Sequence, residues 1–229
     1  IKKQIEDEVL KFKKILKQIK SQSKIFALVI EPGMKYMHSK ITCPNFNNFL
    51  GKKKFSKKNN FVFEAHSTDY QPLRILKKLT KNNFKFLKVG PELTYNYSRS
   101  LFFMQNLEEK FSLKKKSDVK NKILTSIKKN KKYWKAYYSV GRSNLLLNSK
   151  LDRMRYYLNL KPIVNSINIL KENNNNIDKK KIIKFLSSNF EKDFLKLCKA
   201  NLTNFDILKL IFISQSLKKY FLACGFSIR

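Results

Sequence analysis

Cysteine, glycine and proline are scarce in this chain of 229 residues, which has three Cys, five Gly and five Pro. Cys43, Cys198 and Cys224 lie far apart and form no CxxC pair. Their spacing argues against a disulfide framework and against a structural zinc site built from clustered Cys and His. Because no disulfides are expected, we predict a reducing, cytoplasmic setting.

Long apolar runs are also absent. No run approaches the ~20 residues that a membrane-spanning helix needs, so we expect no membrane partner. The first residues, Ile1-Lys2-Lys3, are charged and lack the apolar centre of a signal peptide. The sequence does not start with Met, and we therefore expect a fragment of a longer protein.

Acidic residues and arginine are rare beside lysine. The chain has 16 Asp and Glu against 50 Lys and Arg, a formal net charge of +34, and only six of the basic residues are Arg. A basic face that binds nucleic-acid phosphates is one interpretation. However, the lysines are spread along the whole chain, and Arg is the residue preferred for bidentate phosphate and base contacts. We therefore expect no specific nucleic-acid partner.

The apolar pattern predicts alternating helices and strands in the first half of the chain. Continuous apolar runs predict strands over 25–30, 61–63 and 84–89, and residues spaced three and four apart predict a helix over 5–19. This alternation favours an α/β fold with a parallel sheet. After Phe111 no strand is expected. Further helices are expected over 72–79, 95–111, 118–129, 131–138, 162–170, 182–186, 190–197 and 203–224, with a linker at 173–176.

The second strand ends in a cluster of chemically versatile side chains. Alternation along Phe63-Glu64-Ala65-His66 places Glu64 and His66 on the same face of the strand. A carboxylate beside an imidazole can ligate a metal ion or act as an acid–base pair. The alternative is a hydrogen-bonded structural histidine, since one Glu and one His do not complete a zinc site.

Ser67, Thr68 and Asp69 follow directly. They could cap the helix that begins near Pro72, or form a polar rim that binds a sugar phosphate at a helix N-terminus. Farther along, Lys88 lies in an apolar strand and Gly90 follows it. The lysine could bind phosphate or, if desolvated, act as a Schiff-base nucleophile, while the glycine would let backbone N–H groups approach a phosphate.

Two long motifs carry a family resemblance. Phe63-Glu64-Ala65-His66-Ser67-Thr68-Asp69-Tyr70-Gln71 and Leu87-Lys88-Val89-Gly90-Pro91-Glu92-Leu93-Thr94 resemble the non-catalytic subunit family of class II tagatose-bisphosphate aldolase, also described as tagatose-6-phosphate kinase. Glu31-Pro32-Gly33 and Asp152-Arg153-Met154-Arg155-Tyr156-Tyr157 are weaker matches. The chain departs from the family pattern at Leu158, where the family has Trp, and after Gln71, where Pro72 arrives early.

The resemblance implies a class II aldolase-like TIM (β/α)8 barrel, of which this chain holds only the last three βα units, in residues 1–111. Residues 112–229 would be a helical C-terminal extension. The implied function is that of an accessory subunit, which supports a catalytic, zinc-containing class II aldolase subunit in tagatose, galactitol and N-acetylgalactosamine catabolism. The implied ligand is a sugar phosphate.

Alternatives stay open at this point. The protein could itself be a metal-dependent aldolase, an epimerase or a sugar-phosphate kinase, although no Gly-rich phosphate loop of the Walker or kinase type is present. It could instead be a basic nucleic-acid-binding protein. For Asp152, Arg153 and Arg155 we expect a structural ion-pair cluster, with phosphate binding as the alternative.

Overall fold

The computed structural model describes residues 2–46, 51–111, 115–138 and 144–227, and the chain divides into two compact units. The sheet unit comprises the chain up to Tyr36, Lys40–Val89 and the end from Lys218 on. The helical unit comprises Met37–Ser39 and Gly90–Leu217. This division between Val89 and Gly90 reflects which residues pack compactly with one another. The expected division at residues 111 and 112, into barrel part and extension, stays a prediction.

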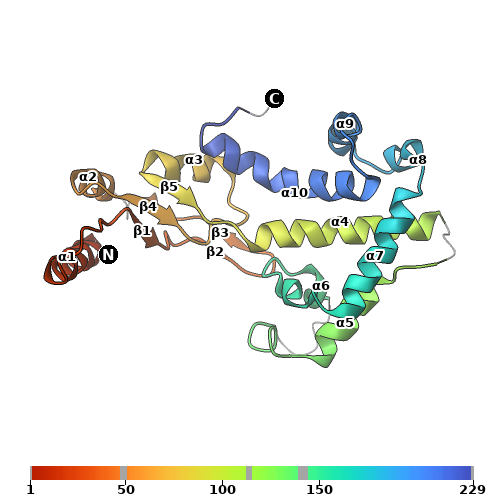
Figure 1. The fold of residues 1–229 in the computed structure, drawn as a ribbon, viewed down its shortest axis with the longest axis horizontal. Helices are drawn as coiled ribbons and strands as arrows, with labels where there is room; N and C mark the ends of the chain where they lie inside the picture. The colour runs from red at the N-terminus through yellow and green to blue at the C-terminus, as the bar shows by residue number, and fades with distance from the viewer. Residues whose placement is uncertain (1, 47–50, 112–114, 139–143, 228–229) are drawn as a thin grey trace. The chain divides into compact units, whose positions relative to one another are not determined.

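A three-stranded parallel sheet forms the centre of the sheet unit, as expected from the sequence (Figure 1). Its strands lie in the order β1-β4-β5, with β4 paired to a neighbour along both edges. The Cα partners Ile30, Ala65 and Leu87 form one row across it. The fold is therefore α/β. The strands are β1 Ala27–Ile30, β4 Val62–Ala65 and β5 Phe84–Leu87.

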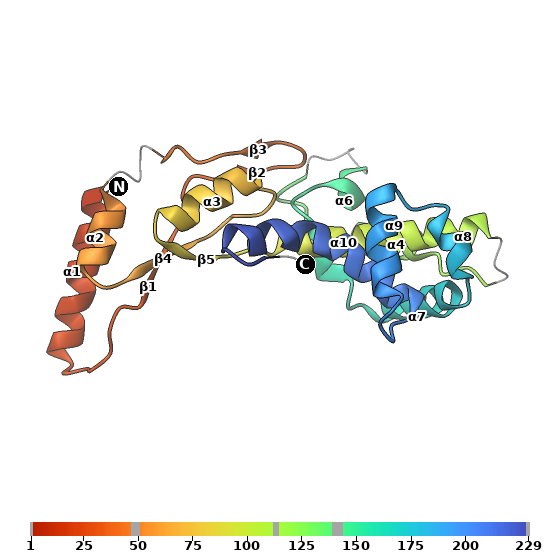
Figure 2. The ribbon, with the colours of Figure 1, turned by 90° about the horizontal axis from the view of Figure 1, so that it is seen from above.

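One face of this sheet is buried. Phe63 and Ala65 of β4 are fully buried, and the Phe63 and Phe84 rings lie 5.2 Å apart. Against them packs α3, Leu73–Lys81, whose Leu76 and Leu79 are also fully buried (Figure 2). The apolar positions on β4 alternate because successive side chains of a strand point to opposite faces.

The opposite face of the sheet is open. Val29, Glu64 and Phe86 are Cα partners in one row. The side chains of Val29 and Phe86 are 52% and 43% exposed, and Phe26 beside them is 70% exposed. Large apolar side chains on a strand are usually buried, so this face is an unusually apolar exposed surface.

The remaining elements of the sheet unit are α1 Lys2–Gln18, α2 Lys52–Lys58 and a short antiparallel hairpin of β2 Lys35–Tyr36 and β3 Ile41–Thr42. The sequence analysis predicted no strand at this hairpin, because strands of two residues are too short to carry a periodic pattern. The predicted apolar stripe of α1 is only partly buried. Ile5 and Val9 are covered, whereas Phe12 and Ile15 are about half exposed.

Packed helices make up the described part of the helical unit (Figure 1). One of the two longest, α4 Pro91–Lys110, packs against α5 and α7. At Lys218 the division between the units falls within α10. The others are α5 Val119–Lys129, α6 Leu145–Asn148, the 3₁₀ helix η2 Arg153–Tyr157, α7 Lys161–Asn175, α8 Lys179–Ile183, α9 Ser188–Leu197 and α10 Asn204–Ala223.

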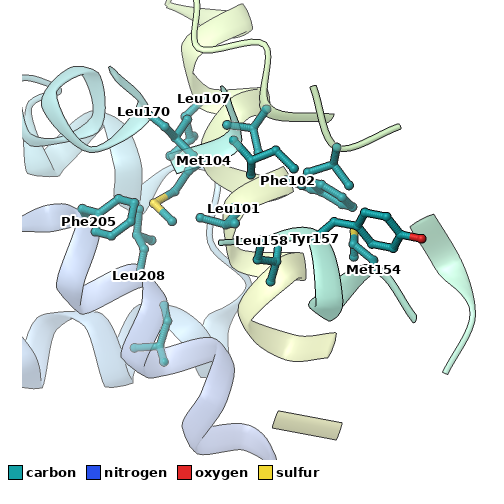
Figure 3. Packing of buried hydrophobic residues seen from close by; sticks show 14 of the residues in the cluster. Leu101, Phe102, Met104, Leu107, Met154, Tyr157, Leu158, Leu170, Phe205 and Leu208 are labelled. Atoms are coloured by element: carbon teal, nitrogen blue, oxygen red, sulfur yellow. The ribbon is translucent and has the colours of Figure 1, made fainter. Parts of the chain in front are cut away.

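One hydrophobic core holds these helices together (Figure 3). Leu101, Met104 and Leu107 recur at three-residue spacing on α4 and are at most 2% exposed. They meet Met154 and Tyr157 of η2, as well as buried residues of α7 and α10. The 3.6-residue period of the helix turns this spacing into one apolar stripe, which is why the sequence predicted the helix correctly.

Two predicted elements of the helical unit are wrong. Asn173–Asn175 is not a linker but the last turn of α7, because Asn174 is buried and its Nδ2 donates to the Leu170 carbonyl at 2.9 Å. Residues 131–138 form successive turns rather than a helix. There Tyr133 stacks on Tyr156, with ring centroids 5.0 Å apart, and the Trp134 indole donates to the Ile127 carbonyl.

All three cysteines are free thiols, as expected from their spacing. Over the described ranges, no helix combines the length and the apolarity that crossing a bilayer requires.

The packing predicts a clear difference between two leucines of the helical unit. Leu101→Ala removes a fully buried side chain and should lower the free energy of unfolding by about 2–5 kcal/mol. Leu210→Ala on α10 removes a side chain that is 39% exposed and should cost less than half as much. Urea unfolding followed by circular dichroism measures both. Equal losses would contradict the assignment of Leu101 to the core.

Candidate functional site

The carboxyl ends of the three parallel strands meet at one edge of the sheet. There the His66 N–H donates to the Ile30 carbonyl at 3.0 Å, and the Lys88 N–H donates to the Ala65 carbonyl at 2.9 Å. In parallel α/β proteins this edge carries the ligand site, because the connections that follow the strands supply polar groups there. We call this edge the strand-end site. It lies within the sheet unit.

Glu64 and His66 form a hydrogen-bonded pair at the strand-end site. The distance from Nε2 of His66 to Oε1 of Glu64 is 2.8 Å, and the two side chains are 26% and 30% exposed. Both point to the open face, as the alternation along β4 predicted. The pair can hold a proton or orient a hydroxyl, because each group remains accessible to a ligand.

A metal site at this pair would need further ligands. In the parts of the chain that the structure describes, no three residues among His, Cys, Asp and Glu gather closely enough to hold a metal ion. The other histidine, His38, belongs to the helical unit. Glu64 and His66 thus supply two of the roughly three protein ligands that a catalytic zinc takes, and on their own they do not fit that metal.

The turn after β4 buries polar residues rather than capping a helix. Thr68 is fully buried, its hydroxyl donates to the Lys88 carbonyl at 2.5 Å, and its own carbonyl accepts from Tyr220 at 2.8 Å. Asp69 is 3% exposed. The N-cap of α3 is Pro72, so the expectation that Ser67 or Asp69 caps this helix is wrong. The backbone turns tightly before the helix, with a left-handed φ of 60° at Ser67, and this turn keeps these side chains from the capping position.

Gln71 is the last of these buried side chains. Its Nε2 donates to the Thr42 carbonyl at 3.1 Å, which ties the turn to β3, while its buried Oε1 has no hydrogen-bond partner. Tyr220 is the residue that sequence reasoning missed. It lies 152 positions from Thr68, and no local pattern could connect the two.

Lys88 and Gly90 follow β5. The strand ends at Leu87, so Lys88 lies just beyond it, with its side chain exposed. In this position it can meet an anion at the strand-end site. Gly90 is the N-cap of α4 in the helical unit, with Pro91 as the first helical residue. A Cβ added at Gly90 would meet nothing within 4 Å, so packing does not explain the glycine.

The helical unit contains Asp152, Arg153 and Arg155, whose contacts differ from those of the expected ion-pair cluster. The carboxylate of Asp152 is 1% exposed and accepts a hydrogen bond from the Thr94 hydroxyl on α4. Arg155 donates at 2.8 Å to the backbone carbonyls of Leu151 and Asp152 rather than to this carboxylate. Arg153 lies over the Tyr137 ring, 3.3 Å from its centroid. Neither arginine makes a salt bridge with Asp152 in the described structure.

Burial raises the pKa of Asp152 from its ordinary value of 3.8 to about 7. Removing the carboxylate from water favours its neutral form, and this outweighs the Thr94 hydrogen bond and the positive charges of Arg155 and Arg99, which act in the opposite direction. Asp152 is thus a costly residue for the fold at neutral pH.

The sequence matches one described protein family. The sequence profile of the family described as "D-tagatose-1,6-bisphosphate aldolase subunit GatZ/KbaZ-like" matches residues 3–225. Two relatives named D-tagatose-1,6-bisphosphate aldolase subunit GatZ come from Escherichia coli. The relative from strain O6:K15:H31 is 29% identical over 160 residues, and that from strain O8 is 28% identical over 176 residues.

These alignments cover 68% and 74% of this chain but 38% and 42% of the relatives, so the chain matches well under half of their length. A solved structure from Sinorhizobium meliloti 1021, titled a probable tagatose 6 phosphate kinase, is 21% identical and superimposes with a TM-score of 0.73. The match covers 87% of this chain and 52% of that one. At this identity the likeness shows the fold.

Thr68→Val should weaken the turn that builds the strand-end site. The change removes the donor to the Lys88 carbonyl and places a methyl group where the fully buried hydroxyl lies. We expect a loss of about 1–3 kcal/mol in the free energy of unfolding. Thr42→Val, at an exposed side chain on β3, is the matched control and should stay within about 0.5 kcal/mol. Chemical unfolding tests both, and an unchanged midpoint for Thr68→Val would refute the role.

Asp152→Asn should stabilise the protein, and more so at higher pH. The pKa of Asp152 is higher in the folded state than in the unfolded one. The protonated side chain therefore favours folding fully below about pH 4, and this contribution to stability is lost as the pH rises towards 7. The neutral amide avoids this loss. We expect a gain of up to about 4 kcal/mol at pH 8 that shrinks towards pH 4.

Asp206→Asn is a control for which we expect the opposite effect on stability at pH 8. Hydrogen bonds from Lys209 and Thr203 lower the pKa of Asp206, so that carboxylate stabilises the fold above its ordinary pKa, and its loss should destabilise the protein slightly at pH 8. Urea unfolding at pH 4.5 and 8 compares the two variants. A pH-independent effect of Asp152→Asn would contradict the raised pKa.

Proposed function

Because this chain belongs to the D-tagatose-1,6-bisphosphate aldolase subunit GatZ/KbaZ-like family, we propose that its protein is an accessory, non-catalytic subunit of a class II tagatose-bisphosphate aldolase. It would support the activity and stability of a separate catalytic subunit, and zinc is expected in that partner. The observation that carries the proposal is the family match over residues 3–225, which runs through both units. A cytoplasmic location and a role in galactitol or N-acetylgalactosamine breakdown belong to the same proposal.

The finer fold assignment is part of the proposal. We interpret β1, β4 and β5 with their helices as the last three βα units of a (β/α)8 barrel, and the region from residue 112 as its helical extension. Two features support this: the strands are parallel in chain order, and one face of the sheet is open. The inner face of a barrel points to its interior. The remainder of a longer chain would then cover Val29 and Phe86.

The strand-end site gives the subunit a means to bind a sugar phosphate. Glu64 and His66 can hydrogen-bond hydroxyl groups, and Lys88 beyond β5 can meet a phosphate. Ser67, which is half-buried at the turn, adds a hydroxyl. The buried Thr68 and Asp69 serve this site by shaping the turn. Such a ligand would stabilise the accessory subunit in the complex by mass action.

A second candidate function is catalysis by this chain itself, because the Glu64–His66 pair, with a distance of 2.8 Å, has the geometry of an acid–base pair. A metal-dependent aldolase or an epimerase would use such a pair. A kinase is less well supported, since the sequence has no Gly-rich phosphate loop. Nucleic-acid binding rests on the net charge alone.

Retro-aldol cleavage of D-tagatose 1,6-bisphosphate separates these functions. The protein, with the upstream barrel part that this proposal implies restored, is assayed alone, beside a catalytic class II subunit alone, and in mixture with it. We expect cleavage only where the partner is present, with a severalfold higher rate or longer half-life in the mixture. A mixture no better than the partner alone refutes the accessory role.

Metal-dependent cleavage by this chain alone would instead establish the catalytic alternative. In that case Glu64→Gln and His66→Gln should each lower kcat at least 100-fold, since each removes one half of the acid–base pair.

A further inference from the structure

Tyrosine, tryptophan and arginine concentrate in two segments of the helical unit. The turns over 131–138 and the 3₁₀ helix η2 at Arg153–Tyr157 contain five of the ten tyrosines of the chain, its single tryptophan and two of its six arginines. Phenylalanine is nearly twice as common in the chain as tyrosine, at 19 against 10, yet neither segment contains one. The compositional bias of the chain towards lysine and phenylalanine therefore does not account for this concentration.

The rings and guanidinium groups of the two segments stack on one another. The Tyr133 and Tyr156 ring centroids lie 5.0 Å apart, and the Arg155 guanidinium lies 4.4 Å from the centre of the Tyr156 ring. Arg153 lies over the Tyr137 ring at 3.3 Å and is 5.7 Å from the centre of the Tyr156 ring. We call Tyr133, Tyr137, Arg153, Arg155 and Tyr156 the Tyr–Arg ladder.

Buried neighbours hold the Tyr–Arg ladder in place. Tyr138 and Tyr157 are 4% and 1% exposed. The Tyr138 phenol accepts a hydrogen bond from the Arg153 backbone N–H at 3.3 Å, and the Tyr157 phenol donates to the Asn130 carbonyl. Because these contacts order the ladder before any partner arrives, its side chains lose little conformational entropy on association.

Part of the Tyr–Arg ladder faces solvent. Tyr137 and Tyr156 are 50% and 44% exposed, and the other three residues are half-buried. Tyr, Trp and Arg are enriched in the cores of protein interfaces and among the residues that dominate binding energy, whereas Lys is depleted there. An ordered, exposed surface of Tyr and Arg, in a chain whose usual cation is lysine, is therefore typical of a protein interface.

The segments that carry the ladder are positively charged. Lys131, Lys132 and Lys135 are exposed, and the Lys132 ammonium lies 5.3 Å from the centre of the Tyr133 ring. Neither segment contains an Asp or Glu, and Asp152, which precedes η2, is 1% exposed. Within the described ranges, none of these three lysines and none of the two ladder arginines forms a salt bridge. A partner that places carboxylates here thus meets cations without a competing acid.

We propose that the Tyr–Arg ladder is the surface on which an acidic segment of the catalytic class II aldolase subunit docks. Carboxylates of that segment accept hydrogen bonds from the guanidinium groups, and its apolar side chains pack against the exposed rings of Tyr137 and Tyr156. The inference rests on the proposed function, which requires a partner, and it names where on this chain that partner binds.

A nucleic-acid strand fits the Tyr–Arg ladder less well. Proteins that bind single strands stack the bases on free aromatic faces. Here Arg153 lies over the Tyr137 ring, and Tyr156 already stacks on Tyr133. The ladder thus occupies ring faces that a base would need, whereas its guanidinium groups carry N–H donors suited to carboxylates.

Binding of the catalytic subunit tests this surface. The restored protein of the cleavage assay is immobilised, and its Kd for a catalytic class II subunit is measured by surface plasmon resonance. Tyr137→Ala removes the more exposed ring of the ladder, and Arg153→Glu reverses a charge that no described carboxylate pairs. We expect each change to raise the Kd at least tenfold, because truncated aromatic and arginine anchors dominate the loss of binding at interfaces.

Two matched variants serve as controls. Phe185→Ala removes a ring that is 42% exposed and packs on the Phe111 ring, and Arg74→Glu reverses the charge of an exposed arginine on α3. Both should leave the Kd within twofold. Thermal unfolding verifies that every variant is folded, and an oligo(dT) strand is titrated in parallel as the probe for nucleic-acid binding.

The outcomes separate this inference from the proposed function. If both ladder variants bind the catalytic subunit within twofold of the unaltered protein, the inference is wrong and the accessory role stands. The same Kd with a lowered melting temperature would show that the protein's own chain covers the ladder, which also refutes the inference. Tighter binding of oligo(dT) than of the catalytic subunit, lost in the ladder variants, would assign the surface to nucleic acid instead. No binding by the unaltered protein would refute both proposals.

Discussion

The central position of β4 in the sheet is the constraint on which the sheet unit depends. Because β4 is paired along both edges, its register fixes the other two strands, and Ile30, Ala65 and Leu87 lie in one row. A shift by one residue would exchange the two faces and expose Phe63 in place of Glu64. The same register places the carboxyl ends of all three strands at one edge. Core and candidate site thus depend on a single pairing.

Local patterns predicted this part of the molecule well for a physical reason. The alternation of Phe63 and Ala65 with Glu64 and His66 is written in four consecutive residues, and a strand converts it directly into two faces. The stripe of α4 around Leu101 is equally local. Wherever consecutive residues decide the structure, the sequence predicted it: the parallel sheet, the Glu64–His66 pair and most of the helices.

Distant contacts decided the features that the sequence did not predict. Asn174 continues α7 because its side chain bonds to Leu170 and its carbonyl accepts from Asn204. Thr68 is fixed by Tyr220, and Asp152 is bonded to Thr94, 58 positions away. Composition cannot reveal such partners. Composition alone therefore cannot distinguish an asparagine run in a linker from one at a buried helix end.

The scarcity of acids in this chain makes the buried ones informative. Glu108 is 1% exposed, and its carboxylate accepts from the Ser117 backbone at 3.3 Å, the Ser117 hydroxyl at 2.5 Å and Asn173 at 2.6 Å. Both of its oxygens are satisfied, so it is a structural acid that joins α4 to α7.

Asp152 is buried to the same degree, yet one of its oxygens has no partner. The surroundings of the two carboxylates differ: Glu108 accepts three hydrogen bonds, whereas Asp152 accepts one from the Thr94 side chain. Burial removes both groups from water, and at Asp152 the Thr94 hydroxyl and the positive charges of Arg155 and Arg99 offset only part of that cost. The raised pKa of Asp152 follows from this incomplete compensation.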